Sequence, residues 1–268
     1  MPGTTARLPR DPAARIDRLE AANPEWAPLL RMVRETLRAL EEGVGDLTLR
    51  EVVPPDPRPE EPAARLHGCT LLVNRVALRH WVGQLPALRE MSDEELRSAL
   101  EAALGETGTI AEPGPDRVAG RLAITPLLEA AGRRSGPHPK PWGSGSCPLC
   151  GAWPILAERR GLEQHRILRC GRCAAEWEYD GLRCSFCGER NHERLGSLLP
   201  ESQARVSVET CASCGSYLKS VTTLGPLPPA ELLLLDLETV ELDLAAAESG
   251  FRRPGGLGSP LEVRVESA

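Results

Sequence analysis

The chain has 268 residues and a formal net charge of −6, with 41% hydrophobic and 26% charged residues. This composition is typical of a globular protein with one domain of fair size and a smaller one. No apolar run reaches the roughly 18 residues that a membrane span requires. No apolar segment follows Arg7 and Arg10. We therefore expect neither a membrane helix nor a secretory signal, and we expect a cytoplasmic protein.

Residues 13–132 predict an α-helical domain. Apolar residues recur at spacings of three and four after Pro24, which is the period of an amphipathic helix; they are Trp26, Leu29, Leu30, Val33, Leu37 and Leu40. Residues 63–89 and 118–132 indicate further helices, and Ser92 with Glu95 forms a capping box before another. The proline-rich stretch 53–62 and residues 105–115 read as loops. The lone Cys69 is expected to be a small buried hydrophobe.

A linker rich in proline and glycine spans residues 133–145, and we place the domain boundary near residue 140. Beyond it lie eight of the nine cysteines of the chain. They form four Cys-x-x-Cys pairs, namely Cys147/Cys150, Cys170/Cys173, Cys184/Cys187 and Cys211/Cys214. Two such pairs can supply a closed, tetrahedral four-sulfur site, so four pairs predict two metal ions.

The spacing favours sequential grouping of the pairs. Between the first two pairs lie 19 residues, and between the last two lie 23, which suits a ribbon with a hairpin between two turns. An interleaved grouping, first with third and second with fourth, stays open. Gly151, Gly171, Gly188 and Gly215 indicate tight turns around the thiolates.

The repeated spacing favours metal over disulfides or a thioredoxin-like redox pair, because disulfides require an oxidising compartment. His165 and His192 are surplus to two four-thiolate sites and are expected to be exposed. Four thiolates accept zinc or rubredoxin-type iron, and the sequence does not separate the two. The interval 140–225 holds 11 Lys/Arg and 9 Asp/Glu, giving only 11 − 9 = +2, which makes nucleic-acid binding the weaker alternative.

Short strands are predicted at 153–158, 165–168, 176–179 and 205–209. After Pro226, apolar residues predict a helix over residues 231–248, and residues 252–268 read as a loose tail. The fold class is therefore α+β: a helical domain (1–140), two rubredoxin-like or zinc-ribbon modules (141–182 and 183–225), and a C-terminal helix with a tail (226–268).

The cysteine motifs resemble those of the formate dehydrogenase accessory protein FdhE family over roughly residues 145–254. The resemblance rests on Cys147-Pro-Leu-Cys-Gly, Leu168-Arg-Cys170-x-x-Cys173 with Trp177, Cys184-Ser-Phe-Cys-Gly, and Glu209-Thr-Cys-Ala-Ser-Cys-Gly-Ser-Tyr-Leu-Lys219, followed by Asp243 and Gly250-Phe251. It implies a cytoplasmic helper of formate dehydrogenase that contacts the molybdenum-containing catalytic subunit. It also implies rubredoxin-like sites at the eight cysteines, with iron as the metal.

No catalytic constellation stands out in the sequence, and closed four-thiolate sites leave no coordination position for a substrate, so we do not expect an enzyme. Our hypothesis is a maturation factor that binds the formate dehydrogenase catalytic subunit. A rubredoxin-like electron-transfer protein is the alternative, and a nucleic-acid-binding zinc ribbon is the weaker one. Purely structural metal and a homo-oligomer also stay open.

Overall fold

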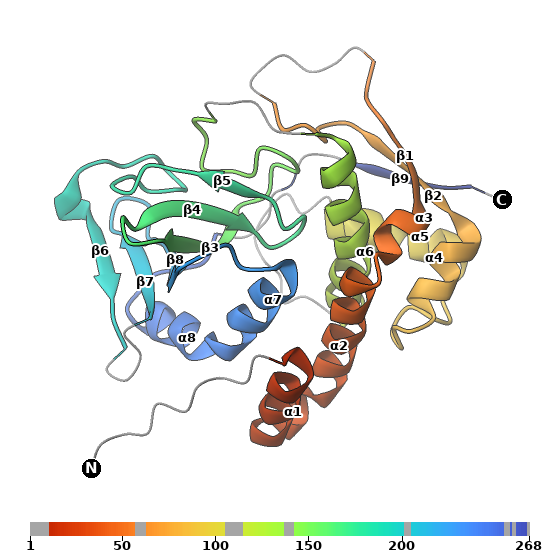
Figure 1. Cartoon of the computed structure of the whole chain (residues 1–268), viewed down its shortest axis with the longest axis horizontal. Coiled ribbons are helices and arrows are strands. Elements are labelled where there is room, and N and C mark those ends of the chain that lie inside the picture. Colours follow the sequence, from red (N-terminus) through yellow and green to blue (C-terminus); the bar gives the residue numbers. More distant parts are fainter. Residues whose placement is uncertain are drawn as a thin grey trace.

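The computed structural model describes residues 11–56, 63–104, 115–136, 142–200, 205–254, 258 and 261–266. Within them, a helical part is followed by a six-stranded sheet with all eight clustered cysteines, and two helices lie under that sheet (Figure 1). The predicted α+β class and the order of its parts are confirmed. The linker residues 137–141 lie outside the described residues, and the predicted domain boundaries stay predictions. None of the described helices combines the length and apolarity needed to cross a bilayer.

The helical part follows the apolar periodicity of the sequence. Leu30, Val33 and Leu37 lie on the buried face of one helix and join the core shared by the helical part. The predicted capping box is present, because the Ser92 amide donates to Glu95 (2.8 Å) and the Glu95 amide donates to the Ser92 hydroxyl (3.3 Å). The helices of this part are α1 (Pro12–Ala22), α2 (Ala27–Glu41), α3 (Val44–Thr48), α4 (Arg75–Val82), α5 (Asp93–Leu104) and α6 (Pro115–Arg134), with a 3₁₀ turn, η1, at Pro24–Trp26.

A three-stranded sheet lies within this helical part, and the helix predicted over residues 63–89 is wrong in its first half. Strand β2 (Thr70–Asn74) buries alternate residues, Leu71 and Val73, which is the period of a strand. It pairs antiparallel with β1 (Leu49–Val53). The side chain of Asn74 then accepts from the Ala77 amide (3.0 Å) and starts α4. Cys69 is buried, as predicted.

The tail that reads as loose from the sequence instead forms a strand. Residues Glu262–Glu266 form β9, which pairs in parallel with β2 (Figure 1). Val263 is buried in the core of the helical part, and the Glu262 amide donates to the Cys69 carbonyl (3.1 Å). The burial of Val263 and the backbone pairing explain why this short segment is ordered, although its partner strand lies far away in the sequence.

The six-stranded sheet has the order β5-β4-β3-β8-β7-β6. Only its central pair, β3 and β8, is parallel; every other neighbouring pair is antiparallel. Its strands are β3 (Pro154–Arg160), β4 (His165–Cys170), β5 (Glu176–Glu178), β6 (Leu195–Leu198), β7 (Val206–Cys211) and β8 (Ser216–Thr223).

The two halves of this sheet repeat one arrangement. In each half the chain runs through a Cys-x-x-Cys turn, two antiparallel strands, a second Cys-x-x-Cys turn and a third strand. The first half uses β3, β4 and β5, and the second uses β6, β7 and β8, with η2 (His192–Arg194) before β6. The first strand of one half and the last strand of the other form the parallel junction, so one continuous sheet carries both cysteine groups.

The helix predicted over residues 231–248 is instead two helices, α7 (Pro229–Glu238) and α8 (Val240–Glu248). The chain bends at Thr239, whose hydroxyl donates to the Leu235 carbonyl (2.6 Å). Both helices lie against one face of the sheet (Figure 1). Arg15 of α1 forms ion pairs with Glu231 (2.5 Å) and Glu238 (2.7 Å) of α7 and so ties the helical part to them.

Candidate metal centres

The first cysteine group comprises Cys147, Cys150, Cys170 and Cys173, all buried. The turn before β3 supplies the first two, and the turn at the end of β4 supplies the other two. The sulfur atoms of Cys147 and Cys173 are 3.5 Å apart, as are those of Cys150 and Cys170. The β3–β4 hairpin therefore brings two turns that are distant in the sequence to one point.

The second group comprises Cys184, Cys187, Cys211 and Cys214. The sulfur atoms of Cys184 and Cys214 are 3.8 Å apart, and those of Cys187 and Cys211 are 3.7 Å apart. The structure thus has the sequential grouping that the spacing favours, and not the interleaved one. This group differs from the first in access, because Cys187 is exposed and Cys214 is partly exposed.

The sulfur positions fit a tetrahedral ion. With metal–sulfur bonds of about 2.3 Å, two ligands of a regular tetrahedron are roughly 3.8 Å apart. Within each group all four sulfur atoms lie within 4.8 Å of one another. Each group therefore matches the donor set and the size of a four-thiolate site for zinc or iron.

Backbone amides point at the thiolates within the turns. The amides of Leu149 and Cys150 donate to the Cys147 sulfur (3.4 and 3.5 Å). Equivalent bonds run from Arg172 to Cys170 and from Phe186 to Cys184, both 3.4 Å. Such donors stabilise negative charge on sulfur, which a bound cation would balance further.

The residue after the second cysteine of each turn has the left-handed backbone conformation, with a positive φ. Gly151, Gly188 and Gly215 have φ of 73°, 79° and 67°. In the turn at Cys170/Cys173 this position is Ala174, with φ of 56°. Gly171 does not take the left-handed conformation; it is small because a Cβ there would lie 2.7 Å from the Ile155 side chain. An alanine therefore takes the place of the glycine that the other three turns use.

Without a cation two thiols of the first group resist ionisation. Burial raises the pKa of the Cys147 and Cys173 thiols well above the ordinary value of 9.0. Hydrogen bonds from the thiols of Cys147 and then Cys150 hold the pKa of Cys170 well below it. In the second group, burial also raises the pKa of Cys184. Four buried thiolates repel one another, so a metal ion is the natural partner for their charge.

One contact joins the first cysteine group to the helical part, and another packs the first cysteine turn against the third. Arg172, inside the second turn, donates to the carbonyls of Ala103 (3.2 Å) and Leu104 (2.8 Å) at the end of α5. Gly145, just before the first turn, lies against Ser185 of the third turn, where a Cβ would come within 1.7 Å of the Ser185 carbonyl oxygen. The helical part and both turns are thereby packed together.

A buried polar cluster, which the sequence reading did not identify, lies between the second half of the sheet and its helices. Lys219 of β8 binds Asp236 (2.5 Å) of α7 and Asp243 (2.8 Å) of α8. The Tyr217 hydroxyl donates to Asp243 (2.6 Å), and Arg253 binds both carboxylates. These residues include Tyr217, Lys219 and Asp243 of the family resemblance, which contact one another here.

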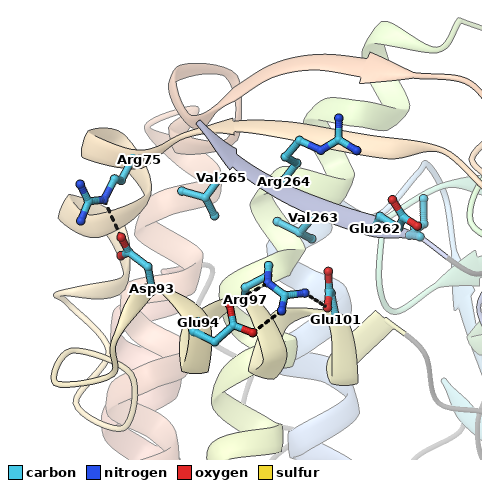
Figure 2. A pocket seen from close by; sticks show the side chains of 10 residues that line it. Arg75, Asp93, Glu94, Arg97, Glu101, Glu262, Val263, Arg264 and Val265 are labelled. Carbon is cyan, nitrogen blue, oxygen red and sulfur yellow. Dashed lines mark hydrogen bonds and ion pairs between the residues drawn. The ribbon is translucent and has the colours of Figure 1, made fainter. Parts of the chain in front are cut away.

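Neither His165 nor His192 takes part in either group. His165 is exposed and binds Glu163 (2.8 Å), and His192 is exposed before β6, as predicted. A hollow between α5 and β9, drawn in Figure 2, holds ion pairs of its own: Arg97 contacts Glu94 and Glu101, and Arg75 contacts Asp93. The arginine and carboxylate charges in this hollow are paired with one another, and the hollow is separate from both cysteine groups.

The fold and the two groups define a class of protein: an α+β chain with a pair of rubredoxin-like four-cysteine sites in one sheet. Residues 182–257 match the family model described as "FdhE, C-terminal domain". This interval comprises the second half of the sheet, α7 and α8. This part of the chain is therefore similar to the FdhE C-terminal domain, as the cysteine motifs predict.

Similar proteins bear the same name. A "Protein FdhE homolog" from Stutzerimonas stutzeri is 39% identical over 111 residues, which are 40% of this chain and 35% of the relative. A homolog from Aquifex aeolicus is 32% identical over 113 residues, 41% of this chain and 40% of the relative. The matched sequence thus spans little more than a third of the length of these relatives.

The likeness in fold extends further than the likeness in sequence. The crystal structure of the FdhE protein from Pseudomonas aeruginosa superposes with a TM-score of 0.60 at 24% identity. The superposition covers 91% of this chain and 93% of that one, so the helical part shares the fold as well.

Proposed function

We propose that this chain is an accessory factor for formate dehydrogenase that binds the catalytic subunit of that enzyme and carries two metal ions. The observation that supports this proposal is the pair of four-cysteine groups on one sheet, the second of which lies within the residues that match the FdhE model. A closed four-thiolate site leaves no position for a substrate, which favours a binding role over catalysis.

In this proposal Cys147, Cys150, Cys170 and Cys173 hold one ion, and Cys184, Cys187, Cys211 and Cys214 hold the other. Zinc would stabilise the sheet, and iron would add one-electron chemistry. The chain contributes the amides that face the sulfur atoms and the apolar surroundings of the first group. The rigid junction of β3 with β8 would fix both sites relative to the client.

The test is a bacterial strain lacking this chain, in which the formate dehydrogenase catalytic subunit is still synthesised. We expect formate oxidation to be lost and to return with the wild-type chain. The tagged chain should also co-purify with the catalytic subunit. The double variant Cys184→Ser/Cys187→Ser should restore less activity than the exposed-surface control Arg31→Gln. Undiminished formate oxidation in the deletion strain would reject the proposal.

A second candidate, electron transfer, is favoured by one observation: the second group has an exposed sulfur ligand, Cys187. An exposed ligand places the metal near the surface and so shortens the distance to a redox partner. It predicts bound iron with a visible thiolate-to-iron absorption band that disappears on reduction. A colourless protein that holds only zinc after anaerobic purification would dismiss it.

A further inference from the structure

A hollow of about 500 Å³ lies on the sheet over β7 and β8, beside the loop that leads into the third cysteine turn. Side chains alternate along β8, so Tyr217 and Lys219 contact α8, while Leu218, Ser220 and Thr222 line the hollow. Ser220 is buried although it lines the hollow, so this floor lies deep. Ser220 and Thr222 contribute hydroxyl groups to this floor.

The hollow is basic on an acidic chain. Its lining includes four arginines and a single carboxylate, Glu209, which sum to 4 − 1 = +3, together with Cys184 and Cys211 of the second cysteine group. The whole chain has a net charge of −6. The four are Arg159, Arg166, Arg183 and Arg205. Such a concentration of one sign raises the local concentration of ligands of the opposite sign.

These guanidinium groups are held in place before any ligand binds. Glu209 binds both Arg159 and Arg166, each at 2.5 Å, and Arg166 also donates to the carbonyls of Asp180 and Arg183 (3.0 and 3.1 Å). Arg166 and Arg183 lie over the Tyr179 ring, 5.6 and 5.4 Å from its centroid. Pre-ordered donors lower the entropic cost of binding an anion.

Two of the arginines have an unpaired guanidinium nitrogen or an exposed guanidinium group. The buried Nε of Arg183 has no hydrogen-bond partner within the described chain. Arg205 is exposed at the mouth of the hollow. Two of the lining residues, Leu182 and Leu199, are 71% and 74% exposed and add apolar surface beside the charge.

We propose that this hollow binds an extended acidic peptide segment of the client protein, with carboxylates on the arginines and apolar side chains against Leu182 and Leu199. An extended segment points its side chains alternately to two sides, which suits this combination of charge and apolar surface. The inference deepens the proposed function, on which it rests for the identity of the client. Peptide binding itself can be measured without that client.

The first experiment uses fluorescence anisotropy with the full chain and a labelled peptide of alternating Glu and Leu. We expect saturable binding that weakens with salt, and no saturable binding of the matching Lys-Leu peptide. The double variant Arg183→Glu/Arg205→Glu should weaken binding by at least about tenfold, because it reverses two charges. Arg31→Glu on α2, an exposed charge reversal outside the hollow, should change it less than about twofold.

Leu182→Ser is the second variant, and it should weaken the peptide several-fold without altering charge. Circular dichroism and metal content verify that each variant is folded. Equal binding by the double variant would overturn the proposal. Equally tight binding of a Glu-Ser peptide or of pyrophosphate would also overturn it, in favour of a small-anion site.

A second experiment separates this inference from the proposed function. The wild-type chain and the double variant are each used to capture the formate dehydrogenase catalytic subunit. If the wild type binds the peptide but does not capture the subunit, the proposed function is wrong and the peptide-binding role of the hollow is supported. If both proteins capture the subunit equally, the hollow is not the docking site and the inference fails.

Discussion

The ammonium group of Lys219 lies 2.8 Å from the carboxylate of Asp243, and this contact joins β8 to α8. Lys219 is only 4% exposed, and its charge is balanced by two carboxylates. It belongs to the strand that directly follows the fourth cysteine turn. The contact therefore fixes the helices to the same strand that closes the second cysteine group.

Removal of this ammonium group should destabilise the fold. We expect Lys219→Met to lower the free energy of unfolding by about 2–4 kcal/mol, because Asp236 and Asp243 would be left with Arg253 alone to balance their charges. Urea denaturation of the metal-loaded protein measures this. The control Arg31→Met, at an exposed position of α2, should stay within about 0.5 kcal/mol of the wild type. Equal stability of the Lys219 variant would show that the Lys219 ammonium group makes no net contribution to stability.

The tyrosines provide a spectroscopic test of the same region. The chain has only two, Tyr179 and Tyr217. Burial raises the pKa of both above 10.0, and the Asp243 carboxylate raises that of Tyr217 further. We expect absorbance at 295 nm to titrate above pH 10 in the folded zinc-loaded protein and near pH 10 in guanidinium chloride.

The sign of the stability change follows from these shifts. Above pH 10 the unfolded chain loses tyrosine protons that the folded chain retains, so stability should fall as the pH rises from there. Tyr217→Phe should remove part of that fall and leave a single titration from Tyr179. A wild-type midpoint at or below pH 10 would contradict the burial of both hydroxyl groups.

The left-handed residues of the cysteine turns offer a reciprocal pair of substitutions. Ala174→Gly should stabilise the protein by roughly 1 kcal/mol, because alanine at positive φ is strained. Gly215→Ala should destabilise it by a similar amount of about 1 kcal/mol. No atom lies within 4 Å of the Cβ that would be added at Gly215, so only the backbone conformation is tested. Thermal unfolding at a fixed metal load measures both, and a shift of both variants in the same direction would refute the assignment.

The two cysteine groups should lose metal at different rates. We expect two ions per chain, and with a chelator in excess the second group should release its ion at least about tenfold faster than the first, since an apolar shell limits solvent access. The cause is the exposure of Cys187 and Cys214, against the full burial of the first group. Absorbance of a metal–chelator dye resolves the two phases.

Cysteine variants show which cysteine group gives rise to each phase of metal release. Cys184→Ser/Cys187→Ser should remove the fast phase and leave about one ion in the slow phase. Release of both ions in one phase from the wild type would show that access does not control exchange. The slow phase should survive Arg31→Gln, which alters neither group.

The cysteine groups could be predicted from the sequence because their signal is local. A Cys-x-x-Cys spacing determines a turn, and the hairpin between Pro154 and Cys170 needs only neighbouring strands. The lengths between the turns favoured the sequential grouping and left the interleaved one open. In contrast, the strain at Ala174 has no marker in composition, because an alanine gives no indication of positive φ.

The long-range parts of the fold could not be predicted in this way. The parallel junction of β3 with β8 and the contact of Arg172 with α5 depend on segments far apart in the chain. The basic hollow was hidden for the same reason, because the interval 140–225 is nearly neutral as a whole. The fold brings together arginines from β3, β4 and two loops (Arg159, Arg166, Arg183 and Arg205), while acids elsewhere in that interval balance them in the sum.

Strand β9 follows both cysteine units in the chain, yet it completes the sheet that begins with β1 and β2. During synthesis on the ribosome, residues 262–266 emerge after the cysteines, so the metal-binding region can mature while the earlier sheet still lacks its third strand. Proteolysis of nascent chains should therefore find the middle of the protein protected before its beginning. A fusion partner placed directly after Glu266 should slow the pairing of β9 with β2 in the helical part. It should not change metal uptake by the cysteine groups.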